Sequence, residues 1–399
     1  MREAYYREST CYICKNKLSK THHYYTEMCP GCGEFNFKKR NNSANLKGYT
    51  AIVTGGRIKI GFETAIKLLD AGAHVIVTSR FPRDTYKRYS KEKNYKKWKD
   101  RLNIYGIDFR HIPSVEEFIY MLIQEQKEIN IIINNAAQTV RKPPIFYRHL
   151  IEDERKDFQE NFELSHINEN QITDIIKLNN CNALTKHKRP YFPDKLYSMP
   201  VSISADLSQI PLLPEDYELD SKYFPIGKYD KDGQQEDRRE LNSWMLELED
   251  VSLIEFYEVI NVNLIAPFLL NTRLKPILSS KKLPSFIINV TAMEGIFFAP
   301  RKKTRHPHTN MAKAALNMMT RTVAAHYEKN KIFMNSVDTG WITNEKPHPL
   351  DIEHSNRKSR MAIDEVDGAA RILDPIFSAI NENQFYYGKL FKNYNEHPW

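Results

Sequence analysis

The chain has 399 residues, of which 41% are hydrophobic and 12% aromatic, a composition typical of a folded globular protein and not of a disordered one. No apolar run approaches the ~20 residues of a membrane-spanning helix. The N-terminus has no secretory pattern, so we expect a cytoplasmic protein with no membrane partner. A net charge of +8 permits an anionic ligand and leaves room for nucleic acid without requiring it.

Four of the five cysteines form two C-x-x-C pairs near the N-terminus, Cys11/Cys14 and Cys29/Cys32. In an intracellular chain such pairs predict four thiolate ligands of one tetrahedral zinc ion in preference to disulfides. The segment of residues 1–45 resembles a zinc ribbon, and a redox-active dithiol is the alternative. We expect the ribbon to have a structural role, although zinc ribbons also contact protein or nucleic acid.

A strand, a glycine turn and a helix come next in the sequence. Residues 49–54 are rich in β-formers, GGRIKIG follows as the turn, and Phe62 to Gly72 has apolar residues at helical spacing. A second strand covers Ala73 to Thr78. This order places backbone N–H groups and a helix N-terminus against a pyrophosphate, so it predicts a dinucleotide-binding half.

Further motifs follow in an order known from one family. An apolar strand runs into Asn134-Asn135-Ala136-Ala137, and Asn263 lies in VINVNLIAPF. The strand Ser285 to Thr291 precedes a long helix that contains Lys313. Together with the glycine turn, these motifs resemble the short-chain dehydrogenase/reductase family over about residues 46–399. The resemblance implies an α/β fold, a doubly wound parallel sheet of the Rossmann type.

The resemblance also implies a nicotinamide cofactor. Lys59 stands where the family has its middle glycine, so its side chain crowds the pyrophosphate unless the ammonium pairs with a phosphate. NAD-specific members carry an acid after the second strand, but Arg80 there suits a 2′-phosphate, which favours NADP(H) over NAD(H). A surface arginine is the alternative for Arg80. The predicted cofactor-binding residues are Gly55, Arg57, Lys59, Ile60, Gly61, Arg80, Asp108, Asn135, Ala136, Lys313 and Thr343.

Two of the four catalytic positions depart from the family. Asn263 and Lys313 match their places, but the serine position is Ala292 and the tyrosine position is Thr309. A threonine hydroxyl is too weakly acidic to act as an ordinary general acid or base. Another group can supply the proton instead, and the candidates near in sequence are His308, His306, Glu294 and Asp338.

Two other interpretations stay open. The reaction can proceed without a proton donor, or the domain can bind the nucleotide without turnover, as a sensor or scaffold. Because a scaffold has no chemical need for Lys313 and Asn263, an oxidoreductase acting on a small-molecule substrate is favoured. His308 is adjacent to Thr309, yet neighbouring residues of a helix point in different directions, which counts against it.

A long insertion at about residues 138–250 interrupts the family pattern. It begins beside the nicotinamide end of the expected sheet, where it can act as a lid or as a surface for a protein partner. A partly disordered segment is the alternative. Family members commonly form homo-oligomers, which the resemblance allows here as well.

Overall fold

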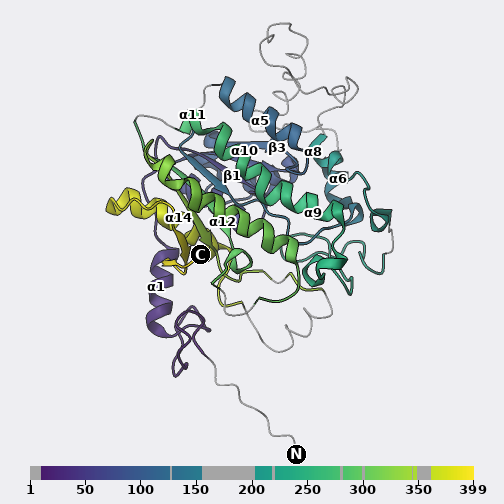
Figure 1. Cartoon of the computed structure of the whole chain (residues 1–399), viewed down its shortest axis with the longest axis horizontal. Helices are drawn as coiled ribbons and strands as arrows, with labels where there is room; N and C mark the ends of the chain where they lie inside the picture. Colours follow the sequence, from purple (N-terminus) through teal and green to yellow (C-terminus); the bar gives the residue numbers. More distant parts are fainter. Residues whose placement is uncertain are drawn as a thin grey trace, which may run out of the picture.

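One eight-stranded sheet with the strand order β3-β2-β1-β4-β5-β6-β7-β8 forms the centre of this computed structural model (Figure 1). All neighbouring strands are parallel except β7 and β8. The strands are β1 (Thr50–Thr54), β2 (His74–Ser79), β3 (Leu102–Gly106), β4 (Ile131–Asn134), β5 (Ser285–Thr291), β6 (Ile332–Asp338), β7 (Leu390–Lys392) and β8 (Asn395–His397). The structure describes residues 10–125, 128–154, 203–217, 221–278, 282–298, 302–343, 345–347 and 361–399.

Helices cover both faces of the sheet because the central strands are apolar on both sides. Ala51, Val53 and Ile133 pack toward α2 (Lys59–Asp70) and α14 (Glu365–Glu382). Ile52 and Ile132 point to the opposite face. That face is covered by α5 (Ile112–Gln124), α10 (Ala266–Arg273) and α12 (Pro307–Glu328), which lie in front of the sheet in Figure 1. The predicted doubly wound α/β fold is confirmed.

The strand order reverses between β1 and β4, which are neighbours although β2 and β3 separate them in sequence. In a doubly wound sheet, ligands bind in the crevice beyond the carboxyl ends of the strands at such a point. The glycine turn after β1 and the residues after β4 and β5 meet at this edge. The sheet topology therefore places the predicted cofactor and catalytic residues together.

The described part of the insertion is packed against the domain. It contains η2 (Pro144–Tyr147), α6 (Arg148–Glu154), α8 (Ile203–Leu207), η5 (Pro214–Tyr217), η6 (Ser243–Met245) and η7 (Leu248–Asp250). Its apolar side chains form a small core with Phe81, at the start of α3 (Pro82–Ser90). The remaining residues of the predicted insertion, 155–202 and 218–220, lie outside the described part of the chain.

The four-cysteine segment contains a helix that the cysteine spacing did not predict. The first pair lies in a tight hairpin with a β-bridge between Thr10 and Lys17. The second pair lies at the start of α1 (Pro30–Arg40), with Pro30 as the first helical residue. Helix α1 packs against α14, so this small N-terminal segment rests on the edge of the Rossmann domain.

Among the described residues, one helical stretch, Leu253–Arg273, is long and apolar enough to cross a membrane. It comprises α9 (Leu253–Ile260), the π-helix η8 (Asn261–Ile265) and α10. Half of its most apolar window is buried inside the protein, against the sheet and α12. Core helices of globular proteins share this composition, so the stretch is weak evidence for a membrane span.

Candidate active site and metal centre

The glycine turn after β1 has room only for glycine at two positions. Gly55 has φ +66°, and a Cβ there would lie 3.0 Å from the Cα of Ala136. A Cβ at Gly61 would lie 2.3 Å from the Gly55 carbonyl oxygen and 2.4 Å from Asn135 Nδ2. Neither position accepts a side chain, because backbone or a fixed amide lies in the way. This close packing forms the cradle expected at a pyrophosphate site.

Asn135 and Ala136 are held against the turn by Thr54. The Thr54 hydroxyl accepts from both backbone N–H groups, at 3.0 Å from Asn135 and 2.9 Å from Ala136. The Asn135 amide donates to the carbonyl oxygens of Thr54 and Gly55, at 3.0 and 3.3 Å. The structure thus brings these predicted cofactor residues together with Gly55 and Gly61.

Lys59 is the first residue of α2 and has φ +56°, the left-handed region that favours glycine. A non-glycine residue in this conformation is strained by about 1–2 kcal/mol. Burial raises the pKa of Asp232 in the insertion, and the charges of Lys231 and Lys59 oppose that rise. The ammonium of Lys59 therefore lies near Asp232 of the insertion. Ile60 follows it and contacts Gly368 of α14.

Two arginines predicted at the cofactor site contact the insertion. Arg57 is buried; it pairs with Asp84 at 2.8 Å and donates to Gln234 at 2.7 Å. Arg80 donates to the Tyr147 hydroxyl at 2.8 Å, and its guanidinium lies 4.5 Å from the centre of the Tyr147 ring. The sequence did not single out Tyr147 or Gln234, because no local pattern relates them to residues more than sixty positions away.

Asp108 lies in the loop just after the end of β3 and is buried. Arg110 donates to both of its carboxylate oxygens, with the shortest contact at 2.6 Å from Nη2 to Oδ2. Burial alone would raise the pKa of Asp108, but the Arg110 guanidinium holds it below its ordinary value. Asp108, predicted to bind the cofactor, is thus an ionised partner of Arg110. Because Asp108 and Arg110 are close neighbours along the chain, this ion pair could have been predicted from the sequence.

Asn263 lies in the π-helix η8, where the helix is locally widened, a feature common at functional sites. It is buried, and its amide is fixed at both ends. Oδ1 accepts from the backbone N–H of Gln138 at 2.7 Å, and Nδ2 donates to the Gln138 carbonyl at 3.0 Å. The predicted catalytic asparagine therefore anchors the first residue of the insertion.

Lys313 lies on α12 with its ammonium under the end of β5. Nζ donates to the backbone carbonyl of Val290 at 2.8 Å. Burial lowers the pKa of Lys313 to about 8, and the charge of Glu294 only partly opposes this. Helix α12, which carries Lys313, packs against η8, which carries Asn263.

Two hydroxyls next to Lys313 have unsatisfied hydrogen-bonding capacity. Thr309 lies one turn before Lys313, and Thr291 ends β5; both side chains are buried. Neither Oγ1 atom has a hydrogen-bond partner within the described parts of the chain. A buried hydroxyl without a partner is unfavourable, so these two groups fit a site that is completed by a polar ligand.

The other proton donors considered from the sequence differ in their surroundings. His308 Nε2 lies 3.4 Å from Glu255 Oε1 on α9, and within the described parts of the chain neither ring nitrogen has a hydrogen-bond partner. His306 stacks on Trp244 of the insertion, with ring centres 3.9 Å apart, and burial lowers its pKa to about 4. Asp338 pairs with Lys392 at 2.9 Å. Burial raises the pKa of Glu294, whose charge acts on Lys313.

Thr343, predicted near the cofactor, lies in the loop after β6. Its hydroxyl donates to Glu345 Oε1 at 2.8 Å. The loop starts beside the end of β5, because Asp338 at the end of β6 is in register with Thr291 at the end of β5.

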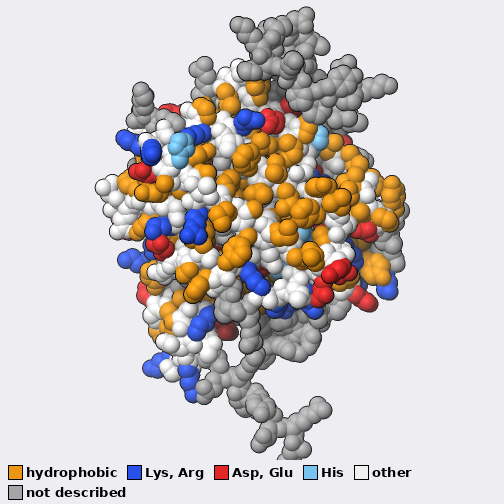
Figure 2. All heavy atoms as spheres, viewed as in Figure 1, with side chains coloured by type: hydrophobic (Ala, Val, Ile, Leu, Met, Phe, Trp, Pro, Cys, Tyr) orange, Lys and Arg blue, Asp and Glu red, His pale blue; other side chains and the backbone are white. Residues whose placement is uncertain are grey.

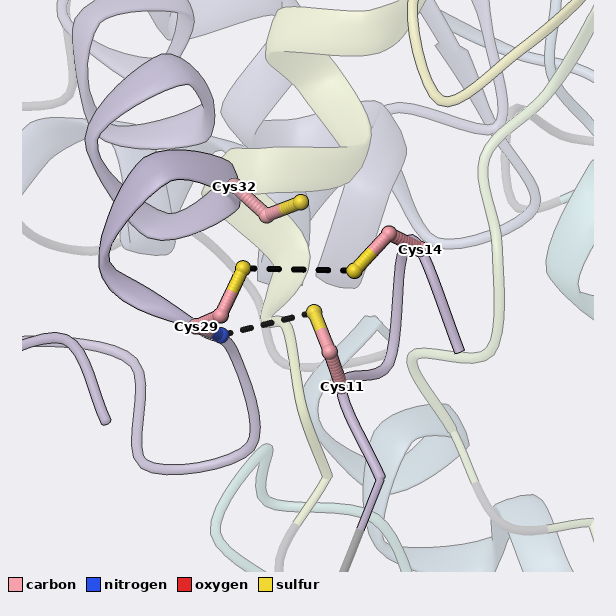
Figure 3. Close-up of side chains that lie close together, drawn as sticks. All are labelled: Cys11, Cys14, Cys29 and Cys32. Carbon is pink, nitrogen blue, oxygen red and sulfur yellow. Dashed lines mark hydrogen bonds between the residues drawn. The ribbon is translucent and has the colours of Figure 1, made fainter. Parts of the chain in front are cut away.

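The four cysteine side chains converge on one point (Figure 3). All four sulfur atoms lie within 4.8 Å of one another, and Cys14 Sγ is 3.9 Å from Cys29 Sγ. A tetrahedral zinc ion with Zn–S bonds of about 2.3 Å separates its sulfurs by about 3.8 Å. The donor set and its spacing therefore fit zinc, and all four are free thiols.

The cluster also favours the thiolate form at one position. Burial would raise the pKa of the Cys11 thiol, but the backbone N–H groups of Cys29, Cys14 and Ile13 lower it to about 6. Burial and contacts with the other sulfurs raise the pKa of Cys32 to about 12. Four thiols this close repel as anions, and a bound dication would stabilise all four as thiolates.

The parallel sheet, the glycine cradle and the buried lysine define a Rossmann-type nucleotide-binding oxidoreductase. Residues 49–181 match the sequence profile described as "short chain dehydrogenase". Residues 242–363 match the one described as "Enoyl-(Acyl carrier protein) reductase". These spans cover more than half of the chain, which belongs to the short-chain dehydrogenase/reductase family. The resemblance drawn from the sequence is confirmed.

Known proteins are similar to this chain in sequence and in fold. "Uncharacterized protein R665" of Acanthamoeba polyphaga mimivirus is 30% identical over 379 residues, which is 92% of this chain and 71% of that protein. Human "Retinol dehydrogenase 13" is 29% identical over 96 residues, 24% of this chain and 29% of that protein. The solved "Pseudomonas aeruginosa RhlG/NADP active-site complex" superposes with a TM-score of 0.51 and 16% identity. It covers 87% of this chain and 95% of its own, a likeness of fold alone.

Proposed function

We propose that this protein is an NADP(H)-dependent oxidoreductase acting on a small carbonyl compound or the corresponding alcohol, with a divergent catalytic site. The observation that carries the proposal is the burial of Lys313 one turn after Thr309, whose hydroxyl has no hydrogen-bond partner within the described residues. Burying an ammonium is unfavourable, and a domain that only supported other structures would have no use for it.

The cofactor assignment rests on the cradle and on Arg80. Gly55, Gly61 and the N-terminus of α2 would hold the pyrophosphate, since helix N–H groups and the helix dipole favour anions. Arg80 would pair with the 2′-phosphate, because only one of its donors is used by Tyr147. Asn135, Ala136 and Asp108 would line the remaining length of the cofactor.

Lys313 is the best candidate for moving the proton in the absence of a tyrosine. Bound NADPH supplies the hydride that reduces a carbonyl carbon. The Lys313 ammonium would donate a proton to the carbonyl oxygen, and the neutral amine would then regain a proton from solvent. Thr309 is much smaller than tyrosine, which leaves space on the same helix face, one turn away. A pKa of about 8 suits a general acid near neutral pH.

Zinc at Cys11, Cys14, Cys29 and Cys32 would have a structural role. Four protein ligands fill a tetrahedral site and leave no position for a substrate or a water molecule. Metal analysis of natively purified protein tests this assignment, and the expected result is one zinc per chain. A chain that folds and carries no zinc contradicts it.

A second candidate is a nucleotide-binding scaffold without turnover. It is favoured by Ala292 and Thr309 at the serine and tyrosine positions, and by Arg57, which is buried and contacts Asp84 and Gln234. Such a scaffold would use the insertion or the four-cysteine segment to contact a protein.

Fluorescence titration with NADPH and NADH separates these possibilities. We expect NADPH to bind more tightly than NADH. If neither binds at millimolar concentration, both the enzyme and the scaffold proposals fail. If NADPH binds, its consumption with a panel of small aldehydes, ketones and diketones distinguishes the two. No consumption with any of them, at any pH between 6 and 9, would favour the scaffold.

A further inference from the structure

We propose that the four-cysteine metal centre positions the loop Thr339–Thr343, so that metal occupancy and cofactor binding are thermodynamically coupled. This inference rests on the proposed function, because it requires that NADPH binds at the carboxyl edge of the sheet. It assigns to the metal centre a task within the nucleotide site, in place of separate contact with a partner.

The metal ligands share an apolar core with this loop. Cys11, Tyr25 and Met28 are buried in one cluster with Ile342 of the loop and Ile363. Ile60, from the first turn of the cradle helix α2, packs against the same cluster. The apolar side chains around the metal centre therefore contact both the loop after β6 and the start of α2, the helix predicted to face the pyrophosphate.

Polar contacts fix the loop backbone from the same side. The Tyr12 hydroxyl accepts from the backbone N–H of Trp341 at 3.1 Å. Arg371 of α14 donates to the Thr339 carbonyl at 2.6 Å and to Asn36 of α1 at 3.3 Å. Tyr12 lies between the first two cysteines of the metal centre, so a metal bound there would hold the backbone that carries this hydroxyl.

Gly340 shows how closely these groups approach the loop. It has φ +84°, and a Cβ there would lie 2.3 Å from Arg371 Nη1 and 2.9 Å from the Tyr12 hydroxyl oxygen. Both the conformation and the space require glycine. The loop thus passes through a narrow gap, one side of which is built by the four-cysteine segment.

Ion pairs join the same segment to the N-terminal turns of α14. Arg40 pairs with Asp364 at 2.5 Å and with Asp367 at 3.0 Å, and the Tyr25 hydroxyl donates to Asp367 at 2.5 Å. Lys39 pairs with Asp374 at 2.6 Å. These contacts involve buried or half-buried groups, so they hold the segment in one orientation relative to the sheet.

Loss of the metal would loosen this arrangement. The metal would join the hairpin that carries Cys11 and Cys14 to the start of α1 at Cys29 and Cys32, and metal binding at so small a site contributes to folding. Without the ion, Cys11 and Tyr12 would no longer be held against Ile342 and Trp341. Coupling between two sites is typically 5–150-fold in affinity, and it is reciprocal. NADPH should therefore raise zinc affinity by the factor by which zinc raises NADPH affinity.

The test compares NADPH titrations of the zinc-loaded protein, the chelator-treated protein and the protein reloaded with zinc. We expect the Kd for NADPH to rise at least about 5-fold on zinc removal and to return on reloading. NADPH at saturation should raise zinc affinity by the same factor in competition with a chromophoric chelator. Cys181→Ser, which alters the cysteine outside the two pairs, is the matched control and should behave as wild type.

A second variant keeps the metal in place. Tyr12→Phe retains all four thiols and removes only the hydroxyl that Trp341 uses; we expect one zinc per chain and about 5-fold weaker NADPH binding. Zinc-free protein that binds NADPH as tightly as the loaded form would overturn the coupling. Absence of NADPH binding by the loaded protein would instead overturn the proposed function, and with it the coupling.

Discussion

Lys313 and Thr309 lie one turn apart on the buried face of α12, and their chemistry depends on their size and burial. The threonine cannot act as an acid near neutral pH, because an aliphatic hydroxyl is far too weakly acidic. The lysine can, because burial lowers its pKa to about 8 while its Nζ stays within 2.8 Å of the Val290 carbonyl. Whether the protein catalyses a reaction therefore depends on whether the Lys313 ammonium can donate a proton.

Replacing Lys313 by arginine should separate charge from proton transfer. A guanidinium stays protonated near neutral pH, so it keeps the positive charge of the side chain but cannot donate a proton. We expect NADPH affinity within a few-fold of wild type and carbonyl reduction slower by ~10²–10⁴-fold. Stopped-flow fluorescence and steady-state rates measure the two quantities. Equal rates for wild type and Lys313→Arg would exclude Lys313 as the proton donor.

The pH dependence follows from the direction of the pKa shift. As a general acid, Lys313 must be protonated, so reduction should be fastest below about pH 8 and fall as pH rises through the lowered pKa. Alcohol oxidation needs the neutral amine, so it should show the opposite trend. Rates measured from pH 6 to 10 test both directions, and a profile flat across pH 8 contradicts the assignment.

Two substitutions at Thr309 complete the test. Thr309→Val removes the hydroxyl and keeps the shape, so reduction should stay within a few-fold of wild type if Lys313 donates the proton. Thr309→Tyr places the family's tyrosine one turn before Lys313, and should raise the rate of carbonyl reduction. The pH at which this rate declines should also change, because a different group then donates the proton. Thermal unfolding of each variant serves as the control for folding. Loss of activity in Thr309→Val would identify the threonine hydroxyl as essential.

At the scale of elements, the insertion lies over the adenosine side of the predicted cofactor site. Its η2 helix supplies Tyr147 to Arg80, α6 supplies Glu154 to the N-terminus of α3, and Gln234 contacts Arg57. Burial raises the pKa of Glu154 to about 7, although the backbone N–H groups of Asp84 and Arg83 oppose this. These contacts make the described insertion part of the site wall.

Arg80→Ala should change cofactor preference. An ionic hydrogen bond contributes about 1.5–3 kcal/mol, so NADPH should bind ~10–100-fold more weakly while NADH binding changes little. Arg273→Ala is the matched control, because this arginine on α10 is largely exposed and lies 3.8 Å from Glu116. Equal loss for NADPH and NADH would show that Arg80 supports the fold and not the 2′-phosphate.

At the scale of the whole molecule, apolar side chains gather on the face that carries α9, α10 and α12 (Figure 2). Tyr257, Phe268, Met311 and Met318 are each about half exposed there. Contiguous apolar patches of this kind mark interaction sites more often than free surface. We therefore expect a homo-oligomer that uses this face.

Light scattering after size-exclusion chromatography tests the oligomer. The wild-type chain should elute as a dimer or larger, and Phe268→Glu with Met318→Glu should elute as a monomer, since each buries a charge in the interface. Ile226→Glu, at an exposed apolar residue of the insertion, is the control and should leave the oligomer intact. A wild-type monomer at micromolar concentration contradicts the expectation.

Local patterns were sufficient wherever a feature depends on residues close together in the chain. The glycine turn, the two C-x-x-C pairs, the strands around Ile52 and Ile132, and the position of Lys313 could all be predicted. The structure bears out the fold, and it brings Gly55, Gly61, Asn135 and Ala136 into one cradle. The assignment of individual site residues to catalysis or cofactor binding stays a prediction, as does the division between residues 1–45 and 46–399.

Contacts between distant segments could not be read from the sequence. Tyr147 on Arg80, Gln234 on Arg57, and Asn263 on Gln138 join residues between 67 and 177 positions apart. No periodicity relates such pairs, because side chains at this separation meet only after the sheet and its helices have packed. The helix α1 at the second cysteine pair was missed for a similar reason, since its contacts are with α14.

The sequence by itself therefore determined the family, the α/β fold, the four-thiol cluster and the loss of the tyrosine at Thr309. These follow from short motifs whose geometry is set by backbone and spacing. Only the tertiary structure decided the surroundings of the ionisable side chains near Thr309. Burial lowers the pKa of Lys313. Asp338 pairs with Lys392, and His308 lies near Glu255. The four-cysteine segment packs against the loop Thr339–Thr343. Burial and charge pairing depend on every neighbour in space, and short motifs along the chain do not identify those neighbours.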